Sequence, residues 1–362
     1  MASVYPFGND PAKTEKYKAF WSREEVSRPL VGFSFVGWFP LKDFSVCRAW
    51  KVNDYITPEM LNPDEWLDDY EDLLREGEEI EDDMLRGACP IQVAFPCFLP
   101  AIFGCKIRVL PDNVLGEELK LPWKEALKVK LDHGNPWLKK YIEFAEALVE
   151  RAEGRYPISH GAELGPTDLH ALLRGHNESL IDLMDEPEKS AELLMNLGHI
   201  FVQFTQEVWK RLPLFHGGYF DAQYQLWAPG PIVRLQEDAT AVYSPDLYRK
   251  LVQPVDRMMA GHFSCNFIHL HSTSMYLLDA FLEIENLRCF EINIETFNIS
   301  VEDMIPYFQR VQEAGRPLLV RGSFTPDEMR LITDSLDPRG LYLHIMVERR
   351  KEVESLRPIL GM

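Results

Sequence analysis

CNFIHLH (residues 265–271) is the first of four short runs, rich in leucine, β-branched and aromatic residues, in the carboxyl-terminal part of the chain. The other three runs are RCFEINI (288–294), PLLVRG (317–322) and GLYLHIM (340–346). Segments with helical spacing of apolar residues separate them, at 274–284, 300–313 and 325–335. Buried strands that alternate with helices of this length are typical of βα units around a parallel sheet.

The same alternation extends toward the amino terminus. Strands are expected near residues 31, 155, 217 and 233, which brings the total to about eight, the number in a closed barrel. Helices are expected at Lys13–Glu25 and, with a strongly acidic outer face, within 54–86. We therefore predict an α/β fold, a (β/α)8 TIM barrel with an amino-terminal helical extension. A single domain would span 1–362, with the extension and first strand in 1–86 and the remaining barrel in 87–362.

Charge and composition narrow the possible functions. The formal net charge is −19, from 57 acidic and 38 basic side chains, and such a charge disfavours nucleic acid and anionic membranes as partners. A highly anionic substrate would need a local basic pocket. The six cysteines show no CxxC spacing, so we expect free thiols. Without an apolar signal segment or a run of about 20 apolar residues, the chain is expected to be cytoplasmic.

Polar side chains gather where the last strands end. His269 and His271 end the run at 265–271, and the period-two alternation of a strand places both on one side of it. The next strand carries Glu291, Asn293 and Glu295 at the same alternation. Because the carboxyl ends of barrel strands face the mouth of the barrel, these residues are candidates for one functional site.

Imidazole and carboxylate groups that converge in this way can hold Zn²⁺, which accepts N and O ligands and keeps one position open in catalytic sites. We predict His269, His271 and His344, the last from the strand at 340–346, as metal ligands, with Glu291 as the alternative to His344. Glu291 and Glu295 are predicted as general acid or base, since a barrel mouth can shift carboxylate pKa values toward the working pH. The alternative is structural, with each group hydrogen-bonded around the rim.

Two earlier strand ends supply further candidates. The strand near 155 is followed by His160 and Glu163, and HGGYFDAQYQLW (216–227) offers an acid among aromatic residues. The aromatic side chains could form one wall of a ligand pocket or, more simply, pack in the core. The remaining predicted residues are the catalytic His160 and Asp221 and the substrate-binding Tyr219, Trp227, Glu163 and Asn293.

The chain also resembles a known family. GAELGPTDLHALLRGHNESLIDLMDEPEKSAELL (161–194) and QEDATAVYSPDLYRKLVQPVDRMM (236–259) are similar to segments of uroporphyrinogen decarboxylase-like proteins. The order of HLH, helix and INIE falls where corrinoid methyltransferases and cobalamin-independent methionine synthases place their catalytic zinc motif. The resemblance runs from about Lys13 to the end of the chain, and it implies the barrel fold.

Departures from the family pattern bear on the reaction. True uroporphyrinogen decarboxylases carry an arginine-rich amino-terminal motif, whereas SREEVSRPLVGFSFVGWFP (22–40) has only Arg23 and Arg28. The zinc methyltransferases use His-x-Cys and a distant Cys, with a glutamate supplied in some members. Here the matching positions hold His269, His271 and, in the region of the distant Cys, His344. Imidazoles in place of thiolates keep the capacity for zinc but make the site more positive.

The resemblance implies a zinc-dependent methyltransferase that moves a methyl group between a small substrate and a thiol or a corrinoid on a separate partner protein. Two alternatives stay open. One is a metal-free decarboxylase or lyase that uses Asp221, Glu291 and His269 as acid–base groups. The other is a barrel without catalysis that binds a ligand or a partner. A homodimer is implied by resemblance alone.

Overall fold

The computed structural model describes residues 5–35, 40–91, 97–111, 113–295 and 299–362. Its main sheet has six parallel strands in the order β1–β11–β10–β9–β8–β7. These strands are β1 (Leu30–Ser34), β7 (Ile232–Gln236), β8 (Cys265–His271), β9 (Cys289–Asn293), β10 (Leu318–Gly322) and β11 (Leu341–Met346). The α/β class and the four carboxyl-terminal βα units expected from sequence are confirmed.

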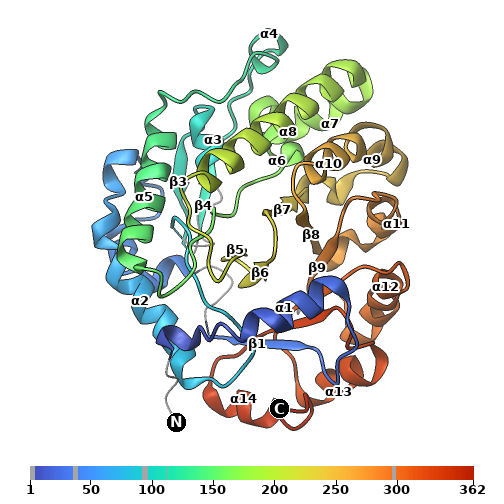
Figure 1. The fold of residues 1–362 in the computed structure, drawn as a ribbon. Coiled ribbons are helices and arrows are strands. Elements are labelled where there is room, and N and C mark those ends of the chain that lie inside the picture. Colours follow the sequence, from blue (N-terminus) through green and yellow to red (C-terminus); the bar gives the residue numbers. More distant parts are fainter. Residues whose placement is uncertain (1–4, 36–39, 92–96, 112, 296–298) are drawn as a thin grey trace.

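Helices cover the outside of this sheet (Figure 1). Within the described residues, no helix combines the length and the apolarity needed to cross a bilayer. The helices are α1 (Lys13–Ser22), α2 (Leu67–Arg75), α3 (Phe98–Ile102), α4 (Trp123–Ala126), α5 (Pro136–Ala152), α6 (Pro166–Arg174), α7 (His176–Asp185), α8 (Pro187–Trp209), α9 (Pro245–Leu251), α10 (Gln253–Ala260), α11 (Leu278–Leu282), α12 (Val301–Glu313), α13 (Pro326–Ser335) and α14 (Arg350–Leu356).

Local sequence signals set several helix starts. The hydroxyl of Ser244 accepts a hydrogen bond from the amide of Leu247 at the start of α9, where Pro245 occupies the first helical position. At α13, Thr325 and Glu328 form a capping box. Such caps satisfy amide groups that a helix leaves without partners, so they fix where the chain turns from strand to helix.

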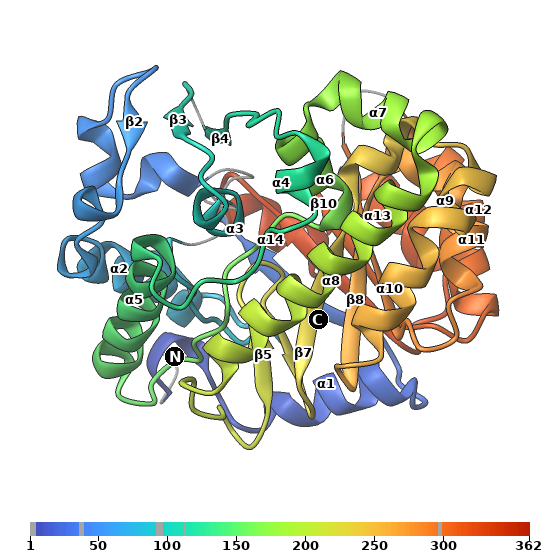
Figure 2. The same ribbon diagram turned by 90° about the horizontal axis from the view of Figure 1, so that it is seen from above.

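Alternate residues of the strands belong to two different cores. On β8, Ile268 and Leu270 pack with the surrounding helices, whereas Phe267 packs on the other, inner face with Tyr17 and Trp21 of α1. All five residues are buried, so the strands are covered on both faces and their sequences show little polar alternation. Helix α1 thus closes the inner face near the amino ends of the strands, as Figure 2 shows.

The expected strands near 155 and 217 do not join the parallel sheet. The first amounts to a single parallel bridge between Ile158 and Ala88, next to Pro157, which has no amide hydrogen to donate to a ladder. The second is β5 (Tyr219–Asp221), which pairs antiparallel with β6 (Leu226–Ala228) in a hairpin on the inner side of the sheet. A third sheet consists of β2 (Tyr55–Ile56), β3 (Ile107–Val109) and β4 (Val114–Gly116). The pairings among described residues therefore give a six-stranded sheet, and closure into an eight-stranded barrel stays a prediction.

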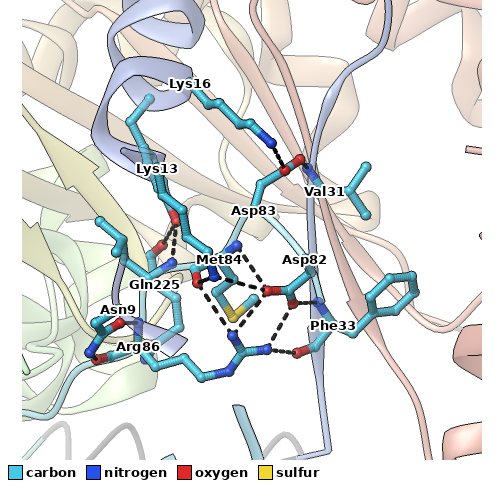
Figure 3. Close-up of polar contacts among 12 residues, drawn as sticks. Asn9, Lys13, Lys16, Val31, Phe33, Asp82, Asp83, Met84, Arg86 and Gln225 are labelled. Atoms are coloured by element: carbon cyan, nitrogen blue, oxygen red, sulfur yellow. Dashed lines mark hydrogen bonds and ion pairs between the residues drawn. The ribbon is translucent and has the colours of Figure 1, made fainter. Parts of the chain in front are cut away.

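Two carboxylates accept hydrogen bonds from amide groups along the edge of β1 that no strand covers (Figure 3). The amide of Val31 donates to the Asp83 carboxylate at 3.0 Å, and that of Phe33 donates to the Asp82 carboxylate at 2.9 Å. The Asp83 amide returns a bond of 2.9 Å to the Val31 carbonyl. Two side chains thus replace part of a strand ladder, which would otherwise leave buried amides without acceptors.

Basic residues neutralise these two carboxylates. Arg86 bridges both oxygens of Asp82, at 3.0 and 2.8 Å, and also donates to the Phe33 carbonyl at 3.0 Å. Arg28 donates to Asp83 at 2.9 Å. Burial alone would raise the pKa of Asp83, but hydrogen bonds from Arg28 and Lys16 outweigh it and lower that pKa.

Replacing Asp82 with alanine removes the carboxylate partner of Arg86, which is only 6% exposed. A buried charge that loses its partner costs about 3–5 kcal/mol, so we expect urea unfolding at pH 7 to show a loss of that size. Asp72→Ala, which breaks an exposed pair with Arg75, is the control and should change stability by less than about 1 kcal/mol. Equal losses in the two variants would contradict the role given to Asp82.

Candidate metal centre

Polar residues occupy the inner face of the sheet at the carboxyl ends of its strands. His269 on β8 lies in register with Gln236 on β7 and Glu291 on β9. His271 lies two residues further along β8, in register with Asn293. Apolar residues such as Phe267 occupy the same face nearer the amino ends of the strands, so the inner face has an apolar end and a polar end.

The two imidazoles face each other. Their Nε2 atoms are 3.2 Å apart. On the opposite side of each ring, Nδ1 of His269 contacts the carboxylate of Glu291, and Nδ1 of His271 contacts that of Glu295. The hydroxyl of Tyr224 also lies 2.7 Å from Nδ1 of His269. Contacts at Nδ1 fix ring orientation and favour the tautomer in which the Nε2 lone pair is free to bind a metal.

Asp238, just beyond the end of β7, completes the cluster. Its Oδ1 lies 3.5 Å from Nε2 of His271. The possible ligand atoms of Asp238, His269 and His271 all lie within 4.8 Å of one another. Sequence reasoning missed Asp238, although IVRLQED (232–238) ends at the same edge of the sheet as the two histidines. The strand-end rule that selected His269 would have selected it too.

Two of the donor separations match those of zinc ligands. Zn–N bonds of about 2.0–2.1 Å at tetrahedral angles place two ligand nitrogens about 3.3 Å apart. The observed separations are 3.2 Å between the imidazoles and 3.5 Å between His271 and Asp238. Three protein ligands of the N and O type are also the set that catalytic zinc sites use. Glu291 and Glu295 would orient the imidazole ligands from behind.

Charges in the cluster are strongly coupled. Burial by itself lowers the pKa of His271, but Asp238 and Glu295 outweigh that effect and raise the pKa to about 10. Burial by itself raises the pKa of Asp238, whereas the hydrogen bond from His271 and the two imidazoles lower it to about 2. The carboxylates therefore favour a cation between them, which a proton or a metal ion can provide.

A cavity of about 420 Å³ adjoins the cluster. This volume lies within the range of about 300–1,000 Å³ that is typical of small-molecule sites. Asp238, His269 and His271 line it, together with Asn293, Arg234 and Arg321. Of the residues predicted to bind substrate, Asn293 thus borders the same cavity as the imidazoles.

His344 does not join the three donors. It lies on β11 in register with Arg321 of β10, and β11 is separated from β8 by two strands. Its ring stacks on Tyr342 with centroids 6.0 Å apart and planes 9° apart. Neither ring nitrogen makes a well-formed hydrogen bond among the described residues, and burial followed by the charge of Arg321 holds the pKa of His344 well below its usual range. The third donor beside the imidazoles is Asp238.

His160, Glu163 and Asp221 are buried, but they do not line the cavity. His160 packs edge-on against Trp209, with ring centroids 5.4 Å apart, and burial lowers its pKa. Glu163 accepts a hydrogen bond from the amide of Leu99 at 3.0 Å, and burial raises its pKa to about 8. Burial likewise raises the pKa of Asp221. Among the described residues that line the cavity, none of these three appears.

The aromatic residues of 216–227, predicted to form one wall of a pocket, lie in different places. Trp227 is 1% exposed, donates from its indole nitrogen to the Phe215 carbonyl at 2.8 Å, and packs in the inner core. Tyr219 lies against Trp209, with ring centroids 4.9 Å apart, away from the cavity. Only Tyr224, from the turn between β5 and β6, reaches the imidazole cluster. For Trp227 the structure thus matches the alternative of core packing.

Comparison with known proteins finds similarity in structure. No protein-family model matches the chain, and no curated protein is significantly similar to it in sequence. Among solved structures, a methyltransferase from Methanosarcina mazei is similar over 96% of this chain and 98% of its own, with a TM-score of 0.62 and 13% sequence identity. At this identity, the similarity establishes a shared α/β fold.

We expect His271 of the metal-free protein to stay protonated at pH 8, because Asp238 and Glu295 raise its pKa to about 10. Glu295→Gln should lower the midpoint by at least about one pH unit, since an adjacent opposite charge shifts a pKa by about 1–3 units. NMR titration of ¹⁵N-histidine-labelled protein measures this midpoint. Glu302→Gln, at an exposed position in α12, is the control, and the same midpoint in wild type and Glu295→Gln would contradict the charge coupling.

Proposed function

We propose that the chain is a metal-dependent methyltransferase in which His269, His271 and Asp238 hold a zinc ion. A methyl group would move between a small substrate in the adjoining cavity and either a thiol or a corrinoid on a separate partner protein. The observation that carries this proposal is the convergence of three metal-binding atoms within 4.8 Å, two pairs of which are 3.2 and 3.5 Å apart.

Two independent similarities support the choice of methyl transfer. The fold is similar, over nearly the whole chain, to that of the methyltransferase from Methanosarcina mazei. The sequence HLH–helix–INIE resembles the zinc-motif region of uroporphyrinogen decarboxylase-like methyltransferases.

We also propose that the protein is located in the cytoplasm. Its six buried free cysteines suit that reducing compartment.

Zinc would act as a Lewis acid that lowers the pKa of a bound thiol or water, or polarises an ether oxygen. The protein would supply orientation and charge. Glu291 and Glu295 hold the Nδ1 sides of the two imidazoles and so keep both Nε2 atoms directed at one point. Asp238 adds one negative charge, so a zinc ion held by two neutral imidazoles and this carboxylate would keep one net positive charge, which would favour an anionic nucleophile.

One observation favours a second candidate, the metal-free decarboxylase or lyase. The buried pair of Glu291 and His269 is arranged as a carboxylate–imidazole dyad, and His269 also lines the cavity. A histidine oriented in this way can serve as general acid or base. This candidate predicts a folded protein that reaches full activity without metal.

Elemental analysis separates the two candidates. We expect close to one zinc per chain after purification and dialysis against trace zinc. His271→Ala and Asp238→Ala should retain less than about a tenth of it, because loss of one of three protein ligands removes most of the affinity.

His344→Ala is the matched control, since this buried histidine lies outside the donor cluster, and it should keep its zinc. Circular dichroism would verify that each variant is folded. Stoichiometric zinc in Asp238→Ala together with its loss in His344→Ala would contradict the proposed ligand set. A folded wild type that binds no zinc would favour the metal-free candidate.

A further inference from the structure

Arg234 is a buried cation on the inner face of β7. It is 3% exposed and lines the cavity next to the imidazole cluster. Its Nη2 donates to the backbone carbonyl of Glu163 at 3.1 Å. In the described part of the chain, this guanidinium forms no ion pair and no other hydrogen bond. Since a guanidinium carries five N–H donors, most of its capacity is left for something in the cavity.

No described acidic side chain forms an ion pair with this guanidinium, although its charge lowers the pKa values of Asp238, Asp221 and Glu163 at longer range. Burial raises the pKa of Glu163 to about 8, so this residue is mostly neutral at pH 7. Burial also raises the pKa of Asp221. Asp238 contacts His271 instead. A buried charge without a direct ion-pair partner is unfavourable, and groups with such electrostatics cluster at functional sites.

A second buried guanidinium lines the same cavity. Arg321 is 4% exposed and lies on the inner face of β10. Its guanidinium carbon lies 5.4 Å from the ring centroid of Tyr224, whose hydroxyl contacts His269. Strands β8 and β9, which carry the imidazoles and Glu291, stand between β7 and β10. The two arginines therefore flank the cluster on either side.

We propose that the small substrate of this site carries one carboxylate group, which Arg234 binds beside the His269–His271–Asp238 cluster. This inference rests on the proposed metal-dependent function and adds the substrate class. A planar carboxylate matches the donor geometry of guanidinium groups. A single charge suits a chain of net charge −19, because one buried cation offsets that field for a monoanion but not for a polyanion.

Thiols with and without a carboxylate can test the inference directly. The protein would be loaded with Co²⁺ as a spectroscopic substitute for zinc and titrated with mercaptoacetate, 3-mercaptopropionate and 4-mercaptobutyrate. The uncharged control is 1-propanethiol. Thiolate binding to cobalt is followed by its charge-transfer absorption, and the visible cobalt bands report an intact centre.

We expect the best of the three acids to bind about 10- to 100-fold more tightly than 1-propanethiol, as charge-assisted hydrogen bonds to a buried arginine allow. Arg234→Gln should abolish this preference and leave the affinity for 1-propanethiol within about twofold. Equal affinities for acid and alkyl thiol in cobalt-loaded wild type would overturn the carboxylate inference while the metal centre stands.

Absence of cobalt binding would instead contradict the proposed function. Calorimetric titration of the best-fitting mercapto acid, 3-mercaptopropionate by default, into metal-free protein then decides the carboxylate inference alone. Binding heat in wild type that Arg234→Gln lacks would support it. Equal heat in both proteins, or none in either, would overturn it.

Discussion

Parallel pairing in register across β7, β8 and β9 places Gln236, His269 and Glu291 side by side on the inner face of the sheet. A slip of one residue in β8 would turn both of its histidines toward the helices and bring Ile268 and Leu270 to the inner face. Burial of those two residues against the helices opposes such a slip. The hydrophobic contacts outside the sheet thus determine which polar groups meet inside it.

Apolar packing closes the inner face near the amino ends of the strands and leaves the polar groups at the carboxyl ends. Helix α1 and the β5–β6 hairpin fill the space near the amino ends of the strands with aromatic side chains. Hydrogen bonds to Asp82 and Asp83 hold the free edge of β1 against the segment that carries these two residues. With that end packed, Asp238, His269, His271 and the two arginines face one cavity at the other end of the strands.

The sequence predicted the sheet and much of the cluster because both follow from short-range patterns. Apolar runs gave the strands, and period-two alternation grouped His269 with His271 and Glu291 with Glu295. Pairing between distant segments was beyond such patterns. His344 has a side chain that can bind metal, but two strands separate β11 from β8, which carries His269 and His271. Asp238, from the turn after β7, supplies the third possible ligand atom. The run near 155 looks like a strand, but Pro157 and the register of its neighbours leave it with a single bridge.

X-ray absorption at the zinc edge of the zinc-loaded protein tests the central claim most directly, because it reports the ligand atoms themselves. Two imidazoles and one carboxylate predict a shell of N and O atoms at about 2.0–2.1 Å, with the outer-shell scattering of two imidazole rings and no sulfur at about 2.3 Å. A sulfur shell, or an oxygen shell without imidazole scattering, would contradict the account.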